Sequence, residues 1–389
     1  MKIRLHLALR ARRGKVRFLA IAVVLGFGIL AARAETKAFP PWQTWVFVAG
    51  LLEWQDKEGF GSFPQKNRQD ARMVRFFREA GVPQKQIIYL KDNAATLKKL
   101  RQELKQFVGN IPPGGVLVFY YCGHGYTDRE GGAALFAPWD AGAKGGWPVR
   151  EVVDTVFDHF KGDRALLLAD CCLSGGLVEA VAKHSAEVDS PKVAAVSSSS
   201  SREISTGDWT FTESFLDALE GKKWVDREGD GEISLQDFAE NSVEDMRVFK
   251  SQRAEAFVPR TWPASAALSA ATEAGKRVGE RIEVDCEGTD YAGRIIGESG
   301  GAFLVRYVGF FSQDDQWVGP GVIRPIPAAD SIAERFAAGS PVEIQWEAEW
   351  YPGRILEDDG GSYHVSYDGY GEDWNEWAEP KRVRRRSPS

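Results

Sequence analysis

Cysteine and histidine are scarce in this sequence. The chain of 389 residues has four cysteines, at positions 122, 171, 172 and 286, and five histidines. Four irregularly spaced cysteines do not make the disulfide framework on which small exported domains depend. The sequence therefore excludes a disulfide-stapled scaffold.

Acidic residues are absent from the first 17 positions, which carry seven lysines and arginines. The apolar run Phe18–Ala32 follows, and Ala32-Arg33-Ala34 has the small residues of a cleavage site. We predict a signal peptide over residues 1–34, with export to the periplasm or the extracellular space. An uncleaved inner-membrane anchor formed by residues 18–32 is the alternative, although this run is shorter than the roughly 20 residues that span a bilayer. In an exported protein, so few thiols suggest that at least one is kept for reactivity.

An excess of positive charge is also absent. Residues 1–34 hold eight of the 49 basic residues and none of the 55 acidic ones, so the remaining chain has 41 basic and 55 acidic residues, a net charge of −14. A chain that acidic is a poor general binder of nucleic acid or anionic lipid. We interpret the short basic segment Lys381–Arg386 as a solvated end. We expect no nucleic-acid partner, and contact with a membrane only through an uncleaved signal segment.

From residue 44 to about residue 259, short apolar strands alternate with amphipathic helices. The predicted strands are residues 44–50, 86–90, 116–121, 164–169 and 193–197. Short, fully apolar strands separated by helices predict an α/β domain of three layers with a mainly parallel sheet, covering residues 42–260. In such sheets the working residues follow the carboxyl ends of the strands.

The last third of the chain contains an internal repeat. After an Ala- and Ser-rich linker, residues 263–276, the sequence matches itself at an offset of 60 residues. For example, the segment Tyr291–Ile295 (YAGRI) matches Tyr351–Ile355 (YPGRI). Each unit has short alternating strands and a Gly-Gly turn, which predicts two small all-β barrels, residues 277–328 and 337–386.

Two motifs follow neighbouring strands of the predicted sheet. His124 lies between Gly123 and Gly125 after the strand at 116–121, and Cys172 follows the strand at 164–169. A thiol nucleophile needs a base or an imidazolium that holds it as the thiolate. Adjacent parallel strands would bring the imidazole and the thiol together.

The two motifs resemble those of the caspase and metacaspase clan of cysteine peptidases, bacterial caspase-like members in particular. That clan has His-Gly after one strand and Asp-x-Cys-x-Ser-Gly after the next, and the run DCCLSG fits in one register, with Cys172 as the nucleophile. The resemblance covers about residues 42–260. The chain departs from the common pattern at Leu173, where metacaspases often have histidine, and at Cys171, where serine is common.

The resemblance implies a caspase-like fold and a role for each residue. Cys172 attacks the peptide carbonyl, and His124 supports the thiolate and protonates the leaving amine. The backbone N–H groups of Gly125 and Cys172 would hold the oxyanion. Asp170 would line the primary specificity pocket and favour Arg or Lys before the scissile bond, with Asp70 as a second pocket carboxylate. The predicted function is an exported cysteine endopeptidase that acts on a peptide or protein; a catalytically silent caspase-fold scaffold that binds ligands is the alternative.

A calcium-loop pattern occupies Asp226–Asp237. The spacing of an EF-hand loop is met by six side chains, with Gly231 at the tight turn: Asp226, Glu228, Asp230, Glu232, Ser234 and Asp237. Glu at the third position and Asp at the twelfth depart from the usual pattern and should weaken or alter binding. The peptidase chemistry needs no cofactor, and the loop is a candidate Ca²⁺ site or a structural brace.

The repeats resemble Tudor-like or agenet-like barrels of the SH3 type. Such barrels form aromatic cages that bind cations through cation–π contacts, and the second unit has six candidates: Trp346, Tyr351, Tyr367, Tyr370, Trp374 and Trp377. The other interpretation is that most of these aromatics fill the small barrel cores. Cys286 stands at the position of Trp346 in the first unit, so we expect an incomplete cage there. Since an exported protein does not meet histone tails, the expected ligand is a peptide, a cell-wall component or the peptidase domain.

The paired cysteines suggest a redox hypothesis. In an oxidising compartment, Cys172 could form a strained disulfide with Cys171, or a disulfide could involve Cys122 beside His124. Either bond would hold the enzyme inactive until it is reduced.

Overall fold

The computed structural model describes residues 36–127, 132–142, 145–187, 192–205, 207–250, 252–326, 336–346, 349–358, 363–371, 374–378 and 382–386. The predicted signal segment lies outside these ranges. Within them, no helix has both the length and the apolar character that a membrane crossing requires.

A six-stranded sheet forms the core of the α/β region, in the order β11-β9-β8-β4-β2-β3. Its strands are β2 (Thr44–Gly50), β3 (Ile87–Lys91), β4 (Val116–Cys122), β8 (Arg164–Asp170), β9 (Lys192–Ser197) and β11 (Glu255–Phe257). All neighbouring pairs are parallel except β11 and β9, which are antiparallel. The prediction of a mixed α/β region with a mainly parallel sheet is confirmed.

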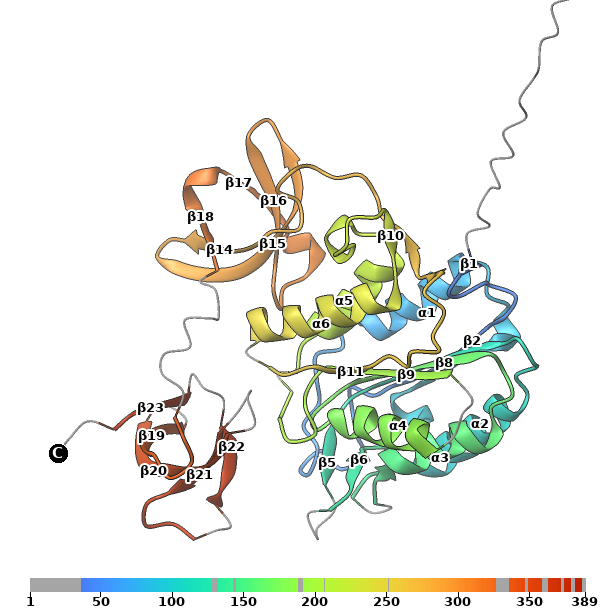
Figure 1. The fold of residues 1–389 in the computed structure, drawn as a ribbon, viewed down its shortest axis with the longest axis horizontal. Helices are drawn as coiled ribbons and strands as arrows, with labels where there is room; N and C mark the ends of the chain where they lie inside the picture. Colours follow the sequence, from blue (N-terminus) through green and yellow to red (C-terminus); the bar gives the residue numbers. More distant parts are fainter. Residues whose placement is uncertain are drawn as a thin grey trace, which may run out of the picture. The chain divides into compact units, whose positions relative to one another are not determined.

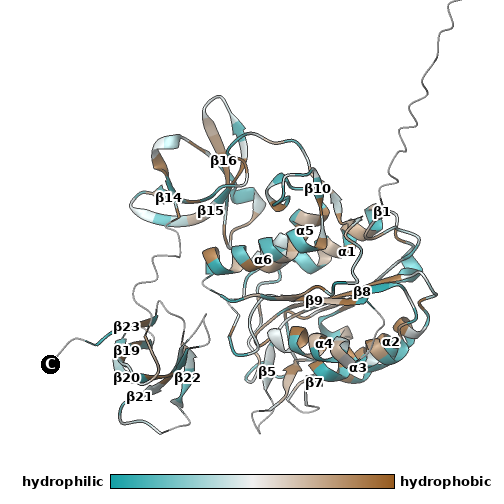
Figure 2. Cartoon of the chain, in the orientation of Figure 1, coloured by the Kyte–Doolittle hydropathy of each residue, from teal (hydrophilic) through white to brown (hydrophobic). Residues whose placement is uncertain are grey.

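Helices cover both faces of this sheet (Figure 1). One face packs against α2 (Leu97–Gly109), α3 (Val149–His159) and α4 (Gly175–Glu187), and the other against α1 (Gln69–Glu79), α5 (Thr210–Leu219) and α6 (Leu235–Lys250). Side chains of a strand alternate between the two faces, so Leu167 enters the first core and Leu166 the second. Because helices shield both faces of the sheet from water, all seven residues of β8 are buried, and the sheet is largely hydrophobic in Figure 2.

Shorter elements complete the α/β region. A small sheet of β5 (Gly125–Thr127), β6 (Ala134–Phe136) and β7 (Trp147–Pro148) follows the His124 loop. Two-residue pairs join β1 (Thr36–Lys37) to β12 (Ala266–Ala267) and β10 (Glu232–Ile233) to β13 (Ser269–Ala270). The 3₁₀ helices of this region are η1 (Gln84–Gln86), η2 (Asp92–Ala94) and η3 (Lys223–Val225).

Two antiparallel five-stranded sheets follow, one for each predicted barrel. The first contains β14 (Arg281–Cys286), β15 (Thr289–Ser299), β16 (Ala302–Tyr307), β17 (Gln316–Val318) and β18 (Ile323–Pro325), with η4 (Ser312–Asp314) and η5 (Pro320–Val322). The second contains β19 (Pro341–Trp346), β20 (Glu349–Asp358), β21 (Tyr363–Tyr367), β22 (Glu376–Ala378) and β23 (Val383–Arg385).

The two small sheets repeat each other in detail. Their strand orders are β17-β16-β15-β14-β18 and β22-β21-β20-β19-β23, which place equivalent strands in equivalent positions. Each sheet has a register shift in its second strand, after Ile295 in the first and after Ile355 in the second. These positions are 60 residues apart, so the sequence repeat is also a structural repeat.

Candidate functional site

His124 and Cys172 each lie two residues beyond the end of a strand. The strands are the parallel neighbours β4 and β8, and their register places Cys122 beside Asp170. The two loops therefore leave the same edge of the sheet from adjacent positions. This is the convergence expected for carboxyl ends of parallel strands.

The glycines that flank His124 allow neighbouring segments to approach this loop closely. Gly123 has φ +149°, and a Cβ there would lie 3.1 Å from the carbonyl oxygen of Leu51. A Cβ on Gly125 would lie only 1.9 Å from the carbonyl oxygen of Cys172. The backbone N–H of Gly125 acts on the Cys172 thiol and lowers its pKa. A side chain at Gly125 would push the His124 and Cys172 loops apart, and one at Gly123 would press on Leu51.

The imidazole of His124 is held by a loop that the sequence did not indicate. Its Nε2 atom lies 2.7 Å from the carbonyl oxygen of Gly61, and its ring packs against Trp54 and Phe63 at centroid distances of 4.4 and 4.6 Å. Because a carbonyl oxygen can only accept, Nε2 carries the proton and Nδ1 is left for proton transfer. The loop follows β2, whose end lies at the same sheet edge. That placement and the aromatic residues of the loop were the features of the sequence that could have indicated its part in the site.

The Cys172 side chain is partly buried, and its thiol accepts a hydrogen bond from the backbone. Burial raises its pKa above the ordinary value, while N–H donors at Ser205, 3.2 Å from Sγ, and at Gly125 act in the opposite direction. Leu173, the next residue, has φ +57°. A left-handed conformation in a branched residue costs free energy and marks a sharp turn, which exposes the nucleophile at the start of α4. Ser205 was not anticipated from the sequence.

Cys171 precedes Cys172 and belongs to the core, although a Cβ on Gly125 would lie 3.1 Å from its Sγ atom. It is buried in the core with Leu167 and Leu177, and its carbonyl oxygen accepts a hydrogen bond from Ser199 Oγ at 2.9 Å. Ser199 also accepts from the backbone N–H of Ser174 at 3.2 Å. The serine-rich segment after β9 thus fixes the cysteine loop. All four cysteines are free thiols, so neither disulfide considered above is formed in this structure.

A cavity of about 150 Å³ opens beside Cys172. Its lining includes two carboxylates, Asp170 and Asp208, and three aromatic residues, Phe63, Trp209 and Phe311, with the exposed Lys66 also among its lining residues. Asp208 forms an ion pair with Lys250. Among the described residues no lysine or arginine forms an ion pair with Asp170, whose Oδ2 accepts a hydrogen bond from Thr212 Oγ1 at 2.5 Å. Burial raises the pKa of Asp170 to about 7.

Asp70 lies outside this cavity. It is fully buried, and its carboxylate is paired with Arg68 at 2.8 Å and accepts a hydrogen bond from the hydroxyl of Tyr89 at 2.8 Å. Arg68 also contacts Asp92 at 2.6 Å and the carbonyl oxygen of Gly50 at 2.8 Å. The structure therefore places Asp70 in an internal ion-pair network that ties α1 to the ends of β2 and β3.

The calcium-loop residues are held by the protein itself. Asp226 accepts hydrogen bonds from the backbone N–H groups of Gly229 and Gly231, at 2.7 and 3.1 Å, and pairs with Lys223 Nζ at 2.7 Å. Asp237 accepts from Ser234 Oγ at 2.6 Å. The side chains of Glu228, Asp230 and Glu232 are exposed. Among the described residues, no three His, Cys, Asp or Glu side chains gather as a group that could hold a metal ion.

Four of the six candidate cage aromatics form one cluster in the second barrel. Tyr351 and Tyr367 meet edge to face at 6.3 Å, and Tyr370 meets Tyr351, Tyr367 and Trp374 at 6.4, 6.2 and 5.5 Å. Tyr367 donates to Glu376 at 2.5 Å, which places a carboxylate beside the cluster. The remaining two candidates lie elsewhere: Trp346 has Arg382 over its ring at 5.9 Å, and Trp377 stacks on His364 at 5.1 Å.

The first barrel has a smaller version of the same cluster. Tyr291, Tyr307 and Phe310 meet edge to face and line a cavity of about 220 Å³ together with Cys286 and Asp314. Three aromatic rings and a carboxylate therefore gather there although Cys286 replaces a tryptophan. The position of Phe310 at the offset of 60 from Tyr370 was the signal that the sequence offered.

Comparison with known proteins bears on the C-terminus. Residues 339–388 match the Agenet domain family. The second barrel is Agenet-like. This finding confirms the predicted Tudor- or agenet-like character of that barrel. No curated protein matches the chain.

Solved structures resemble the chain distantly. Protein GSU0716 from Geobacter sulfurreducens is 15% identical, with 59% of this chain and 97% of that chain covered and a TM-score of 0.41. The tandem Agenet domain 3-4 of ADCP1 is 21% identical, covering 28% of this chain and 79% of that one at a TM-score of 0.14. Domain AGD34 of AGDP1 from Arabidopsis thaliana is 21% identical, with corresponding shares of 28% and 81% and a TM-score of 0.15.

Proposed function

We propose that the protein is a caspase-like cysteine endopeptidase with Cys172 as its nucleophile and His124 as its acid–base residue. One observation carries the proposal: the two residues leave adjacent parallel strands, and Gly125, next to His124, approaches Cys172 so closely that a Cβ on it would lie 1.9 Å from the Cys172 carbonyl oxygen. Peptide hydrolysis by a thiol nucleophile needs a free thiol beside a cavity and a histidine whose tautomer leaves one ring nitrogen able to accept a proton.

The steps follow from these positions. The Cys172 sulfur bonds to the scissile carbonyl carbon as its proton passes to His124, and the carbonyl electrons move to oxygen, where N–H donors such as that of Gly125 hold the negative charge. The tetrahedral species collapses, the C–N bond breaks and His124 returns the proton to the leaving amine. Water then attacks the thioester, which releases the acid and restores the thiol.

Substrate selection is proposed to rest on Asp170. It is the carboxylate of the cavity that has no ion-pair partner among the described residues, whereas Asp208 is paired with Lys250. A guanidinium or ammonium group placed beside it would lower its raised pKa and form a charge-assisted hydrogen bond. The enzyme is therefore expected to cleave after arginine or lysine.

The barrels are proposed to bind ligands and thereby either recruit substrates to the peptidase domain or target the protein to a particular place. In the second barrel the Tyr351–Tyr367–Tyr370–Trp374 cluster lies beside Glu376, and Tyr370 and Trp374 are 51% and 55% exposed. Exposed aromatic edges beside a carboxylate suit a cationic group on a peptide or cell-wall component.

The test is cleavage by the purified full chain. Fluorogenic peptides that differ only in the residue before the scissile bond, Arg, Lys or Asp, are compared for the wild type, Cys172→Ala and Cys171→Ala. We expect cleavage after Arg and Lys that Cys172→Ala abolishes and Cys171→Ala retains, with no requirement for Ca²⁺. Absence of any cleavage lost in Cys172→Ala favours the rival function, a catalytically silent caspase-fold scaffold. Cleavage after Asp alone overturns the role of Asp170.

A further inference from the structure

The cavity beside Cys172 has a wall that comes from the first barrel. Gly309 and Phe311, in the loop between β16 and β17, line the same cavity as Asp170 and Cys172. They are separated from Cys172 by more than 130 positions in the sequence and belong to the repeat region. The catalytic cavity is thus completed by a residue outside the α/β region.

The loop that carries Phe311 has a defined conformation. Gly309 has φ +81°, and the Phe310 N–H donates to the carbonyl oxygen of Tyr307 at 3.2 Å, which closes a turn. Asp314, the last residue of the 3₁₀ helix η4, accepts a hydrogen bond from the N–H of the N-cap residue Phe311 at 3.0 Å. Phe310 lies in the aromatic cluster of the barrel, whereas its neighbour Phe311 faces the catalytic cavity.

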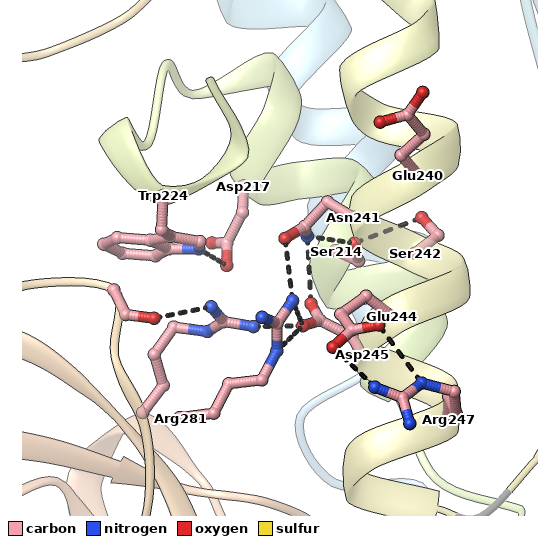
Figure 3. A network of polar contacts seen from close by, with 12 residues as sticks. Ser214, Asp217, Trp224, Glu240, Asn241, Ser242, Glu244, Asp245, Arg247 and Arg281 are labelled. Atoms are coloured by element: carbon pink, nitrogen blue, oxygen red, sulfur yellow. Dashed lines mark hydrogen bonds and ion pairs between the residues drawn. The ribbon is translucent and has the colours of Figure 1, made fainter. Parts of the chain in front are cut away.

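The first barrel is anchored to α6 by a buried charge network, shown in Figure 3. Arg281 Nε donates to Asp245 Oδ1 at 2.8 Å, and Arg294 of the neighbouring strand forms a second ion pair with the same carboxylate. Asn241 Nδ2 donates to the other Asp245 oxygen at 2.9 Å. Asp245 and Arg294 are only 4% and 6% exposed, so the contact is largely closed to water.

Helices α5 and α6 together also position Asp170, which lines the cavity. Thr212 of α5 donates to Asp170, while Ser214 of α5 accepts a hydrogen bond from Asn241 of α6 at 2.9 Å. Trp209, immediately before α5, lines the cavity together with Phe311. The position of the barrel and the position of the pocket carboxylate are therefore set by one packed unit.

We propose that the first barrel is part of the substrate pocket and that Phe311 is a specificity-determining residue. The proposal rests on the peptidase function above and deepens it. Phe63, Trp209 and Phe311 line the same cavity as the Asp170 carboxylate, so their rings can pack on the aliphatic stem of a lysine or arginine while Asp170 meets its charged end. Phe311 narrows the cavity, so bulky reagents reach Cys172 poorly.

The first experiment compares Phe311→Ala with Trp317→Ala in the full chain. Trp317 is an aromatic residue of the same barrel that is 55% exposed and outside both described cavities. For peptides with Arg before the scissile bond we expect Phe311→Ala to raise KM about 10-fold with kcat nearly unchanged, because ground-state contacts with the stem are lost. Trp317→Ala should keep the wild-type constants. Equal effects of the two variants, or none from Phe311→Ala, overturn the proposal.

The second experiment separates this proposal from the peptidase function. Alkylation of Cys172 by iodoacetamide and by a bulky aryl maleimide is followed by peptide mass mapping, with no substrate involved. We expect Phe311→Ala and the anchor variant Arg281→Gln to accelerate the maleimide at least about 5-fold more than iodoacetamide, since the wall is removed or loosened. If the wild type cleaves no peptide but the two variants show this acceleration, the peptidase function is wrong while the role of Phe311 as a wall of the cavity is supported. Unchanged maleimide rates in both variants would contradict the proposal that Phe311 and the first barrel restrict access to Cys172.

Discussion

The Nε2 atom of His124 lies 2.7 Å from the carbonyl oxygen of Gly61. This contact fixes which ring nitrogen carries the proton, because a carbonyl oxygen has no proton to donate. It also ties the acid–base residue to the loop that follows β2, a strand separated from β8 and the Cys172 loop by β4.

We predict that neutral His124 is the Nε2–H tautomer. Long-range ¹H–¹⁵N correlation spectra recorded at pH 8 report the tautomer directly, and His124→Asn identifies its signals. An Nδ1–H tautomer would contradict the arrangement, since Nδ1 could then not accept the proton of Cys172.

Gly125→Ala is expected to lower the peptidase activity strongly. The new Cβ would lie 1.9 Å from the carbonyl oxygen of Cys172, so the two loops must separate. A displacement of this size at the reacting groups costs on the order of 100-fold in kcat/KM. Peptide cleavage and Cys172 alkylation measure the effect.

Gly321→Ala is the matched control for that substitution. No heavy atom lies within 4 Å of a Cβ placed on Gly321, and its φ is outside the left-handed region. Wild-type activity is expected. Full activity in Gly125→Ala would show that the two loops do not need this contact.

The stability of the protein should fall as the pH rises from about 4 to 7. Burial raises the pKa of Asp170 from 3.8 to about 7 and that of Glu213 from 4.5 to about 7. Between these values the folded chain holds protons that the unfolded chain has lost, so the free energy of unfolding decreases with pH, by up to about 1.4 kcal/mol per pH unit for each group. Above pH 7 these contributions are gone.

Urea unfolding at pH 5, 6, 7 and 8 measures this dependence. Asp170→Asn and Glu213→Gln should each flatten the slope between pH 5 and 7, because an amide does not titrate in this range. A stability that rises with pH over this range, or a slope unchanged in both variants, would contradict the assigned direction.

Asp245→Asn is expected to destabilise the chain by about 3–5 kcal/mol, because two arginine side chains lose their buried partner. Arg324→Gln is the control. Arg324 is half exposed and pairs with Asp285 and Asp290 on the same barrel, so its removal should cost at most about 1 kcal/mol. Urea unfolding compares the two; equal costs would show that the Asp245 network contributes no more than a surface ion pair.

The sheet and the placement of the two motif residues could be predicted because they depend on local patterns. Apolar runs such as residues 164–169 are long enough to be buried strands, and parallel strands necessarily end at one edge. His124 and Cys172 follow such strands directly, so their neighbourhood needed no further information. The 60-residue repeat predicted the two barrels for the same reason.

Contacts between distant segments could not be predicted in this way. Asp70 follows β2 in the sequence as a pocket residue would, but inside the core Arg68 pairs with its carboxylate and Tyr89 donates a hydrogen bond to it. The docking of Arg281 and Arg294 on Asp245, and hence the approach of Phe311 to the catalytic cavity, depends on three-dimensional charge complementarity, which leaves no periodic signal in one sequence.

The aromatic cluster of the second barrel predicts a binding site that one tryptophan can report. Trp374→Ala should weaken binding of butyltrimethylammonium, a probe for cationic ligands, by at least about 5-fold, because Trp374 contributes an exposed ring beside Tyr370. Trp346→Ala is the matched control, since Trp346 is 44% exposed and has Arg382 rather than Tyr370 against its ring. Isothermal titration of the full chain measures both variants. Equal weakening by the two substitutions would show that the cation does not bind at the Tyr370–Trp374 pair. These rings would then serve only to stabilise the barrel.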